Sequence, residues 1–231
     1  MPRQVPDGDA PLSRRRWGSA QPVWDLPVRL VHWLLAALIA FSWWSVHNHH
    51  TDWHIWSGCA ILTLLIFRLL WGFAGSSTAR WSTFVRGPAS VAAYLRGRWN
   101  GIGHTPLGAL SVIAIFLALA LQVGFGLIAE DEDGLYTGPL YRLVSIDTSD
   151  KARDLHELWF NVILGLIVLH IAAIIFYRLR GMKLTKPMIT GRAVLTPGAQ
   201  PMRSGKWWAA LICLALSIGI TRWVIAGAPP L

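Results

Sequence analysis

The sequence predicts an all-α integral membrane protein, with a bundle of four transmembrane helices followed by a fifth, C-terminal one. Of the 231 residues, 54% are hydrophobic and 14% are charged, which is more apolar than an ordinary soluble domain. The apolar residues form long runs, five of which reach the roughly 20 residues that cross a bilayer. Histidines recur at matching depths in these runs, and an ionisable group at such a depth indicates a functional site.

The expected spans lie at about 26–46, 54–74, 105–128, 155–177 and 207–226. The first begins with Pro27 in its opening turn, a favourable helix start. A very short turn separates it from the second, so these helices are expected to be antiparallel neighbours. Residues 88–96 are typical of a short amphipathic helix on the membrane surface. The third span contains Gly108, Gly124 and Gly126, and glycine lets a neighbouring group approach a membrane helix closely.

We divide the chain into an N-terminal arm (1–25), a four-helix domain (26–177), a basic linker (178–206) and a fifth helix with a short tail (207–231). Seventeen of the 21 Lys and Arg residues lie on the side of the arm and the linker, and four lie on the other. The positive-inside rule therefore predicts a membrane protein with a cytoplasmic N-terminus and a C-terminus on the opposite side.

The arm is expected to be retained, because it lacks an apolar stretch followed by a cleavage site. Ser13–Arg16 resembles a twin-arginine signal only faintly. The net charge of +9 is mainly a topology signal. We expect no nucleic-acid partner, since the basic residues form no single patch.

Four histidines form two levels in the predicted bundle. His156 and His170 are fourteen residues apart, so they share one helix face and are separated by about 21 Å. His32 opens the outward-running first span and His54 opens the inward-running second span. Depth therefore pairs His32 with His170 at the inner level and His54 with His156 at the outer level.

Two imidazoles at each level favour haem over a metal ion. A closed zinc site needs four ligands, and no carboxylate or thiolate accompanies either pair. A haem needs only axial ligands, and histidine is a common one. Cys59 and Cys213 are the only cysteines and cannot form a CxxCH attachment, so haem would be held non-covalently. The sequence thus predicts two non-covalently bound haems.

The remaining polar residues of the spans have less specific interpretations. The outer turn between the first two spans contains His47, His49 and His50. These residues form either a polar turn at the membrane interface or a surface metal site. His104 has no histidine partner at its depth. We expect it to lie at the membrane interface; the alternative is a role near the protonation site of a quinone. Gln122 could form an interhelical hydrogen bond or contact a haem or quinone.

Several segments resemble the bacterial di-haem membrane b-type cytochromes of the cytochrome b-561 type, which include the cytochrome subunit of nickel–iron hydrogenases. The resemblance covers residues 22–180 and rests on Arg29-Leu30-Val31-His32-Trp33, His54-Ile55-Trp56-Ser57-Gly58, Arg68-Leu69-Leu70-Trp71-Gly72 and the spacing of His156 and His170. It implies that the four histidines are the axial ligands of two b haems. It also implies electron exchange between a quinone and a partner protein. With the topology above, it places the chain in a bacterial inner membrane, with the N-terminus in the cytoplasm and the C-terminus in the periplasm.

Arginines near the haem levels are candidates for contacts with haem propionates, through bidentate hydrogen bonds. Arg29 lies one turn before His32, Arg153 lies one turn before His156, and Arg68 is at the inner end of the second span. Positive-inside placement explains Arg29 and Arg68 equally well.

The expected function is transmembrane electron transfer between a quinone pool and a redox partner. We expect the chain to act as the cytochrome subunit of an oxidoreductase system, not as a stand-alone enzyme. The loop 129–154, with seven acids against three bases, is expected to be structured by turns. Its acidic part, 130–154, is either a dock for a periplasmic c-type cytochrome or hydrogenase-like protein or simply a solvated loop. One alternative function is direct oxidation or reduction of a small periplasmic substrate such as superoxide or a metal ion. Another is a haem-free anchor or a proton or metal transporter.

Overall fold

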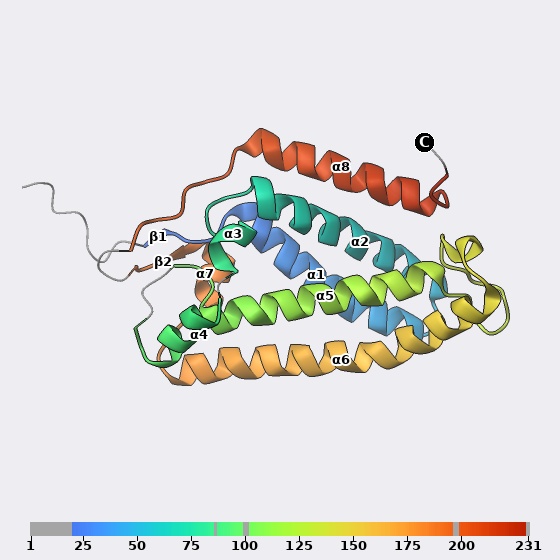
Figure 1. Cartoon of the computed structure of the whole chain (residues 1–231), viewed down its shortest axis with the longest axis horizontal. Helices are drawn as coiled ribbons and strands as arrows, with labels where there is room; N and C mark the ends of the chain where they lie inside the picture. Colours follow the sequence, from blue (N-terminus) through green and yellow to red (C-terminus); the bar gives the residue numbers. More distant parts are fainter. Residues whose placement is uncertain (1–19, 86, 99–101, 196–198, 230–231) are drawn as a thin grey trace, which may run out of the picture.

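A computed structural model describes residues 20–85, 87–98, 102–195 and 199–229. Five of the seventeen basic residues counted above lie outside these ranges: Arg3, Arg14, Arg15, Arg16 and Arg86. Five long helices are present: α1 (Leu26–His47), α2 (Thr51–Ala74), α5 (Pro106–Ile128), α6 (Ile146–Leu179) and α8 (Trp207–Ile225). Each is long and apolar enough to cross a membrane, which confirms the predicted fold class. Four of them run side by side along the molecule, with α8 against α2 (Figure 1).

The bundle consists of two helical hairpins. Helix α1 packs against α2 and α5 packs against α6, while the hairpins meet mainly through α2 and α5. The centre of this contact is a cluster of small and branched side chains from α2, α5 and α6: Ile61, Leu65, Ala118, Leu119, Val123 and Ile163. Because α1 and α6 approach each other less closely, side chains that face inward from these helices have room between the hairpins.

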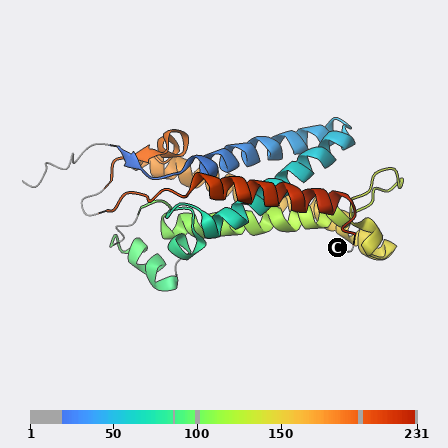
Figure 2. The same cartoon turned by 90° about the horizontal axis from the view of Figure 1, so that it is seen from above.

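Short elements gather at one end of the bundle, called here the inner end (Figure 2). They are α3 (Trp81–Phe84), α4 (Pro88–Leu95), α7 (Thr185–Thr190) and two strands, β1 (Gln21–Pro22) and β2 (Arg192–Ala193). The strands pair antiparallel and tie the N-terminal arm to the linker. The amphipathic segment expected at 88–96 is helical, as α4. The opposite, outer end holds the turn between α1 and α2 and the loop before α6.

Helix α6 begins earlier than the sequence analysis predicted. Residues 146–154 were assigned to a loop structured by turns, and this assignment is wrong, because they form the first turns of α6. Ser145 caps the helix by accepting a hydrogen bond from the Thr148 amide, and Asp147 lies in the first turn, where a negative charge is favourable. The 34 residues of α6 span about 51 Å, well beyond the thickness of a bilayer core.

Helix α8 packs on α2 through small residues spaced four apart. Ala209, Cys213, Ser217 and Thr221 are buried along one face of α8. Thr63 of α2 donates a hydrogen bond to Thr221 at 3.0 Å between hydroxyl oxygens. Small residues allow such close packing in membrane helices. The fifth helix is therefore joined to the bundle through α2.

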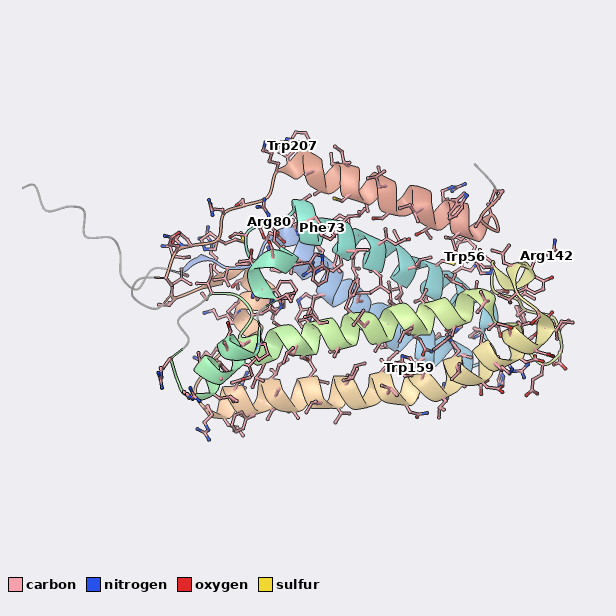
Figure 3. All side chains as sticks on the ribbon, viewed as in Figure 1. Trp56, Phe73, Arg80, Arg142, Trp159 and Trp207 are labelled. Atoms are coloured by element: carbon pink, nitrogen blue, oxygen red, sulfur yellow. The ribbon has the colours of Figure 1, made fainter. Side chains whose placement is uncertain are left out.

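Exposed aromatic side chains mark both ends of the apolar region (Figure 3). Trp207 at the start of α8 is 75% exposed, and Trp56 near the outer end of α2 is 78% exposed. Tryptophan is enriched at membrane–water boundaries, where its ring is apolar and its N–H is hydrated. The two residues therefore fit interfacial positions at the inner and outer ends.

Candidate functional site

The outer pair of histidines lies on facing helices. His54 is in the first turn of α2 and His156 is on α6, with ring centroids 5.8 Å apart and planes at 85°. His54 Nδ1 lies 3.0 Å from the Ser42 hydroxyl and 3.1 Å from the Ser42 carbonyl oxygen. His156 Nδ1 donates to the Gln122 carbonyl oxygen at 2.9 Å. With both Nδ1 atoms engaged, the Nε2 atoms are the nitrogens available to a metal.

A cavity of about 530 Å³ surrounds this outer pair. Its size is within the range of small-molecule and cofactor sites. The walls come from α1, α2, α5, α6 and the loop 129–139, and they include Gly58, Gly126, Arg153 and Phe160. Most of the lining is apolar, with carboxylates from the loop at its edge, so a flat apolar group with polar substituents suits the space.

The inner pair is formed by His32 of α1 and His170 of α6. Their ring centroids are 6.4 Å apart, with the planes at 51°. Among the residues that the structure describes, His32 Nδ1 is buried and has no hydrogen-bond partner. The histidines that meet are those that the predicted depths pair.

A cationic and aromatic cluster lies close to the inner pair. The Arg68 side chain is buried, and its guanidinium lies 4.5 Å from the Trp81 ring centroid and 5.6 Å from that of Phe84. The His104 ring lies against Phe84 and Trp24, at 4.8 and 4.5 Å between centroids. Within the described chain, Arg68 Nη1 and His104 Nδ1 are buried without a hydrogen-bond partner. The Arg68 guanidinium is a buried donor without an acceptor, and such a group fits an anion that binds here.

His104 differs from the interfacial residue that we expected. Its Nδ1 is buried and its ring packs between aromatic side chains, so it is part of this inner cluster. Burial, together with the nearby positive charge of Arg68, lowers the pKa of His104 to about 3. The side chain is therefore neutral at physiological pH.

Both histidine pairs fit the axial ligands of a haem. A metal–imidazole bond is about 2 Å long, so two imidazoles on opposite sides of one metal have ring centres roughly 6 Å apart. The observed separations are 5.8 Å and 6.4 Å. In the described part of the chain, no group of three or more His, Cys, Asp or Glu residues could hold a metal ion. The donor sets therefore suit a porphyrin, which brings its own four nitrogens.

Two of the outer-turn histidines, His47 and His50, contact neighbouring tryptophans. His47 Nδ1 hydrogen-bonds to the Trp43 carbonyl, and the His50 ring lies 4.5 Å from that of Trp53. His49 has a left-handed backbone, with φ of 59°. These contacts support the interpretation as an interfacial polar turn.

Two of the predicted propionate partners already have protein partners. The Arg29 guanidinium donates to the Ile189 carbonyl, which joins α1 to α7. Arg153 lines the outer cavity and forms ion pairs with Asp150 at 3.2 Å and Asp154 at 3.5 Å. Its positive charge is thus shared with carboxylates of its own helix. Arg68 has no such carboxylate within ion-pair distance in the described residues.

Gln122 forms the interhelical hydrogen bond that we gave as one of its interpretations. Its side-chain Nε2 donates to the His156 carbonyl at 2.9 Å. Ser42, whose oxygens contact His54, was not among the predicted site residues. Ser42 lies one helical turn before Val46, near the outer end of α1, and only its depth relative to His54 could have indicated this role.

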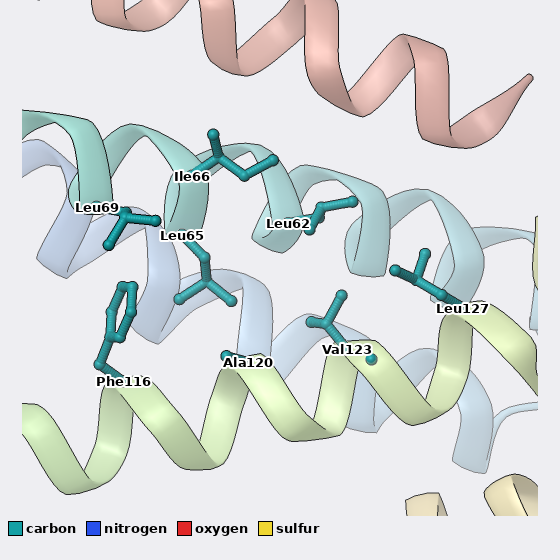
Figure 4. Close-up of a pocket in the computed structure, with 9 residues that line it drawn as sticks. Leu62, Leu65, Ile66, Leu69, Phe116, Ala120, Val123 and Leu127 are labelled. Atoms are coloured by element: carbon teal, nitrogen blue, oxygen red, sulfur yellow. The ribbon is translucent and has the colours of Figure 1, made fainter. Parts of the chain in front are cut away.

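A second, apolar groove lies between α2 and α5 (Figure 4). It measures about 190 Å³ and is lined by apolar residues only: Leu62, Leu65, Ile66, Leu69, Phe116, Ala120, Val123, Gly124 and Leu127. Its lining offers no ligand to a metal or a charged group. Val123 and Leu127 line both this groove and the outer cavity, but the groove itself contains no histidine.

An all-α membrane bundle with opposed histidine pairs between its helices is a membrane b-type cytochrome. The family model described as prokaryotic cytochrome b561 matches residues 23–191, and the chain belongs to this family. It is a multi-pass membrane protein that binds haem b and takes part in electron transfer. Comparisons with curated proteins and with solved structures found no match. Family membership makes a haem-free transporter or anchor untenable.

Proposed function

We propose that the protein transfers electrons across a bacterial inner membrane through two b haems, between a quinone and a redox partner at the outer end. In this proposal His54 and His156 hold the outer haem, and His32 and His170 hold the inner one. The observation that supports it most is the pair of imidazole separations, 5.8 and 6.4 Å, at two levels of one bundle. A bound haem supplies one-electron redox chemistry; the protein supplies axial nitrogens and the surrounding charge.

The polypeptide has different tasks at the two levels. At the outer level, carbonyl groups fix the orientation of both imidazoles, and a mostly apolar cavity surrounds the pair. At the inner level, the buried Arg68 guanidinium offers hydrogen bonds to a propionate, and we assign that role to it. Arg29 and Arg153 are assigned a weaker, electrostatic contribution at the edges of the inner and outer sites, because their guanidiniums already bind carbonyls or carboxylates.

The charge around the outer cavity favours a basic protein as the redox partner. Carboxylates line the cavity edge, at Glu130, Asp131, Glu132 and Glu157. A negative rim attracts a cationic surface and repels an anion such as superoxide. A periplasmic c-type cytochrome or a hydrogenase-like protein with a basic face fits this surface, and direct reaction with superoxide fits it poorly.

The membrane orientation in this proposal follows from the basic residues. Most described basic residues lie at the inner end, where Asp25 is the single described acidic residue. The outer end contains the acidic loop. The inner end is therefore cytoplasmic and α8 ends in the periplasm. Labelling of a cysteine introduced at position 133 or at position 183 with an impermeant reagent, in intact cells, checks this orientation: position 133 should react and position 183 should not.

The electron-transfer proposal is tested with the full-length holoprotein in proteoliposomes. A short-chain quinol should reduce the b-type absorption bands, and oxidised basic cytochrome c added outside should reoxidise them. Replacing His54 with alanine should remove the second step while leaving reduction of the remaining haem. If quinol does not reduce the protein at any orientation, the quinone part of the proposal is wrong.

A further inference from the structure

Gly126 of α5 is in direct contact with the ring of His156. A β-carbon at this position would lie 2.9 Å from His156 Cε1 and 3.1 Å from Nδ1, closer than side chains normally approach. Gly126 is one helical turn after Gln122, whose carbonyl oxygen accepts the Nδ1 hydrogen bond at 2.9 Å. The missing side chain is what lets the imidazole reach that carbonyl.

The Gln122 carbonyl oxygen can accept the imidazole hydrogen bond in addition to its hydrogen bond within α5. A backbone carbonyl oxygen has two lone pairs, so it can serve the helix and a side chain at once. The side-chain Nε2 of Gln122 in turn donates a hydrogen bond to the His156 carbonyl oxygen, also at 2.9 Å. The two reciprocal bonds fix α6 against α5 at this level and hold the ring in one orientation.

This hydrogen bond has an electronic consequence for a metal ligand. Donation from Nδ1 to a carbonyl places the lone pair on Nε2 and makes the imidazole a stronger donor. A stronger axial donor stabilises ferric over ferrous iron, which lowers the midpoint potential. His54 has the same kind of partner in Ser42, whereas His32 Nδ1 lacks a partner among the described residues.

We propose that Gly126 is a positioning residue for the outer haem: it admits the His156–Gln122 hydrogen bond and thereby holds the midpoint potential of the outer haem below that of the inner haem. The inference rests on the haem ligation proposed above. It assigns a role to a glycine that touches the ligand and not the iron. The carboxylates that line the outer cavity act in the same direction, because negative charge stabilises ferric iron.

The test compares Gly126→Ala with Gly124→Ala in the full-length holoprotein. An added β-carbon at Gly124 would meet nothing within 4 Å, so this variant controls for the glycine-to-alanine change in the same helix. Optical redox titration gives the two midpoint potentials, and the His32→Ala variant, expected to keep only the outer haem, assigns them. We expect Gly126→Ala to raise the outer potential or reduce outer haem content, with the inner haem unchanged. Gly124→Ala should match the wild type.

Two results overturn the inference. One is Gly126→Ala protein with full outer haem at an unchanged potential. The other is a wild-type outer potential at or above the inner one, and this measurement decides the matter if Gly126→Ala does not accumulate. Failure of the underlying ligation proposal looks different, because His156→Ala would then retain both haems.

Discussion

The Trp81 indole lies directly on Gly72. Trp81 Nε1 donates to the Leu69 carbonyl at 3.0 Å, and a β-carbon at Gly72 would lie 1.7 Å from the same nitrogen. The indole in turn carries the Arg68 guanidinium on its face. Gly72 therefore determines where the buried cation of the inner site lies.

Gly72→Ala should displace Trp81 and with it Arg68. Overpacking of this kind costs about 1–3 kcal/mol. We expect a lower thermal midpoint and weaker retention of the inner haem, measured by thermal unfolding and haem content in detergent. Gly165→Ala, at a helical position with nothing within 4 Å of the added carbon, is the control. Equal stability of the two variants would show that the indole moves without cost.

Arg68→Met should weaken the inner site. The substitution removes a buried donor and a positive charge from the cluster of Arg68, Trp81, Phe84 and His104 near the inner pair. Loss of a charged hydrogen bond of about 1.5–3 kcal/mol corresponds to haem retention reduced roughly tenfold or more. Any inner haem that remains should titrate at a lower potential. Arg80→Met is the matched control, because Arg80 is exposed and its side chain hydrogen-bonds to the Gly75 carbonyl alone among the described residues (Figure 3). If the inner haem had the same midpoint potential in Arg68→Met and Arg80→Met, the assignment of Arg68 to the inner site would be wrong.

The acidic outer loop should control association with a basic partner. Neutralising residues 130–133 to the corresponding amides should slow electron exchange with cationic cytochrome c on the order of tenfold at low salt. The difference should vanish at high ionic strength, because salt screens the attraction. Stopped-flow reduction at several salt concentrations measures this. Wild-type rates that do not depend on salt would contradict docking at this loop.

Acidification should destabilise the protein through His104. Its pKa is lowered to about 3 in the folded protein, against an ordinary value of 6.5. Below pH 6.5 the unfolded chain therefore takes up a proton that the folded protein does not, so stability falls as the pH decreases toward 3. Thermal midpoints of wild type and His104→Gln at pH 7.5 and pH 5 give the comparison. The variant should lose less stability between these values, and parallel losses would contradict the assignment.

The sequence was sufficient for the spans and for the histidine pairs. Helix period and span direction alone place His156 and His170 on one face and bring His32 and His54 to their partners. The start of α6 was missed because residues 146–154 are polar, and hydropathy detects the membrane part of a helix and not its extension into water. The Ser145 cap is the local signal that marks the true start.

Contacts between side chains were less accessible to sequence reasoning. The burial of His104 depends on Trp24 and Phe84, which come from other parts of the chain. The same is true of Gly126, one of three glycines noted in its span, because only the position of the His156 ring distinguishes it from Gly124. Periodicity gives the face of a helix but not what touches that face.

Haem content of the four single histidine variants tests the central proposal most directly. Wild-type protein should contain two b haems per chain by pyridine haemochrome assay. His32→Ala and His170→Ala should each remove the same haem, and His54→Ala and His156→Ala should each remove the other, with the second haem retained in every case. Full pigment in all four variants, or a wild-type ratio of one, would contradict the assignment of two histidine-ligated levels.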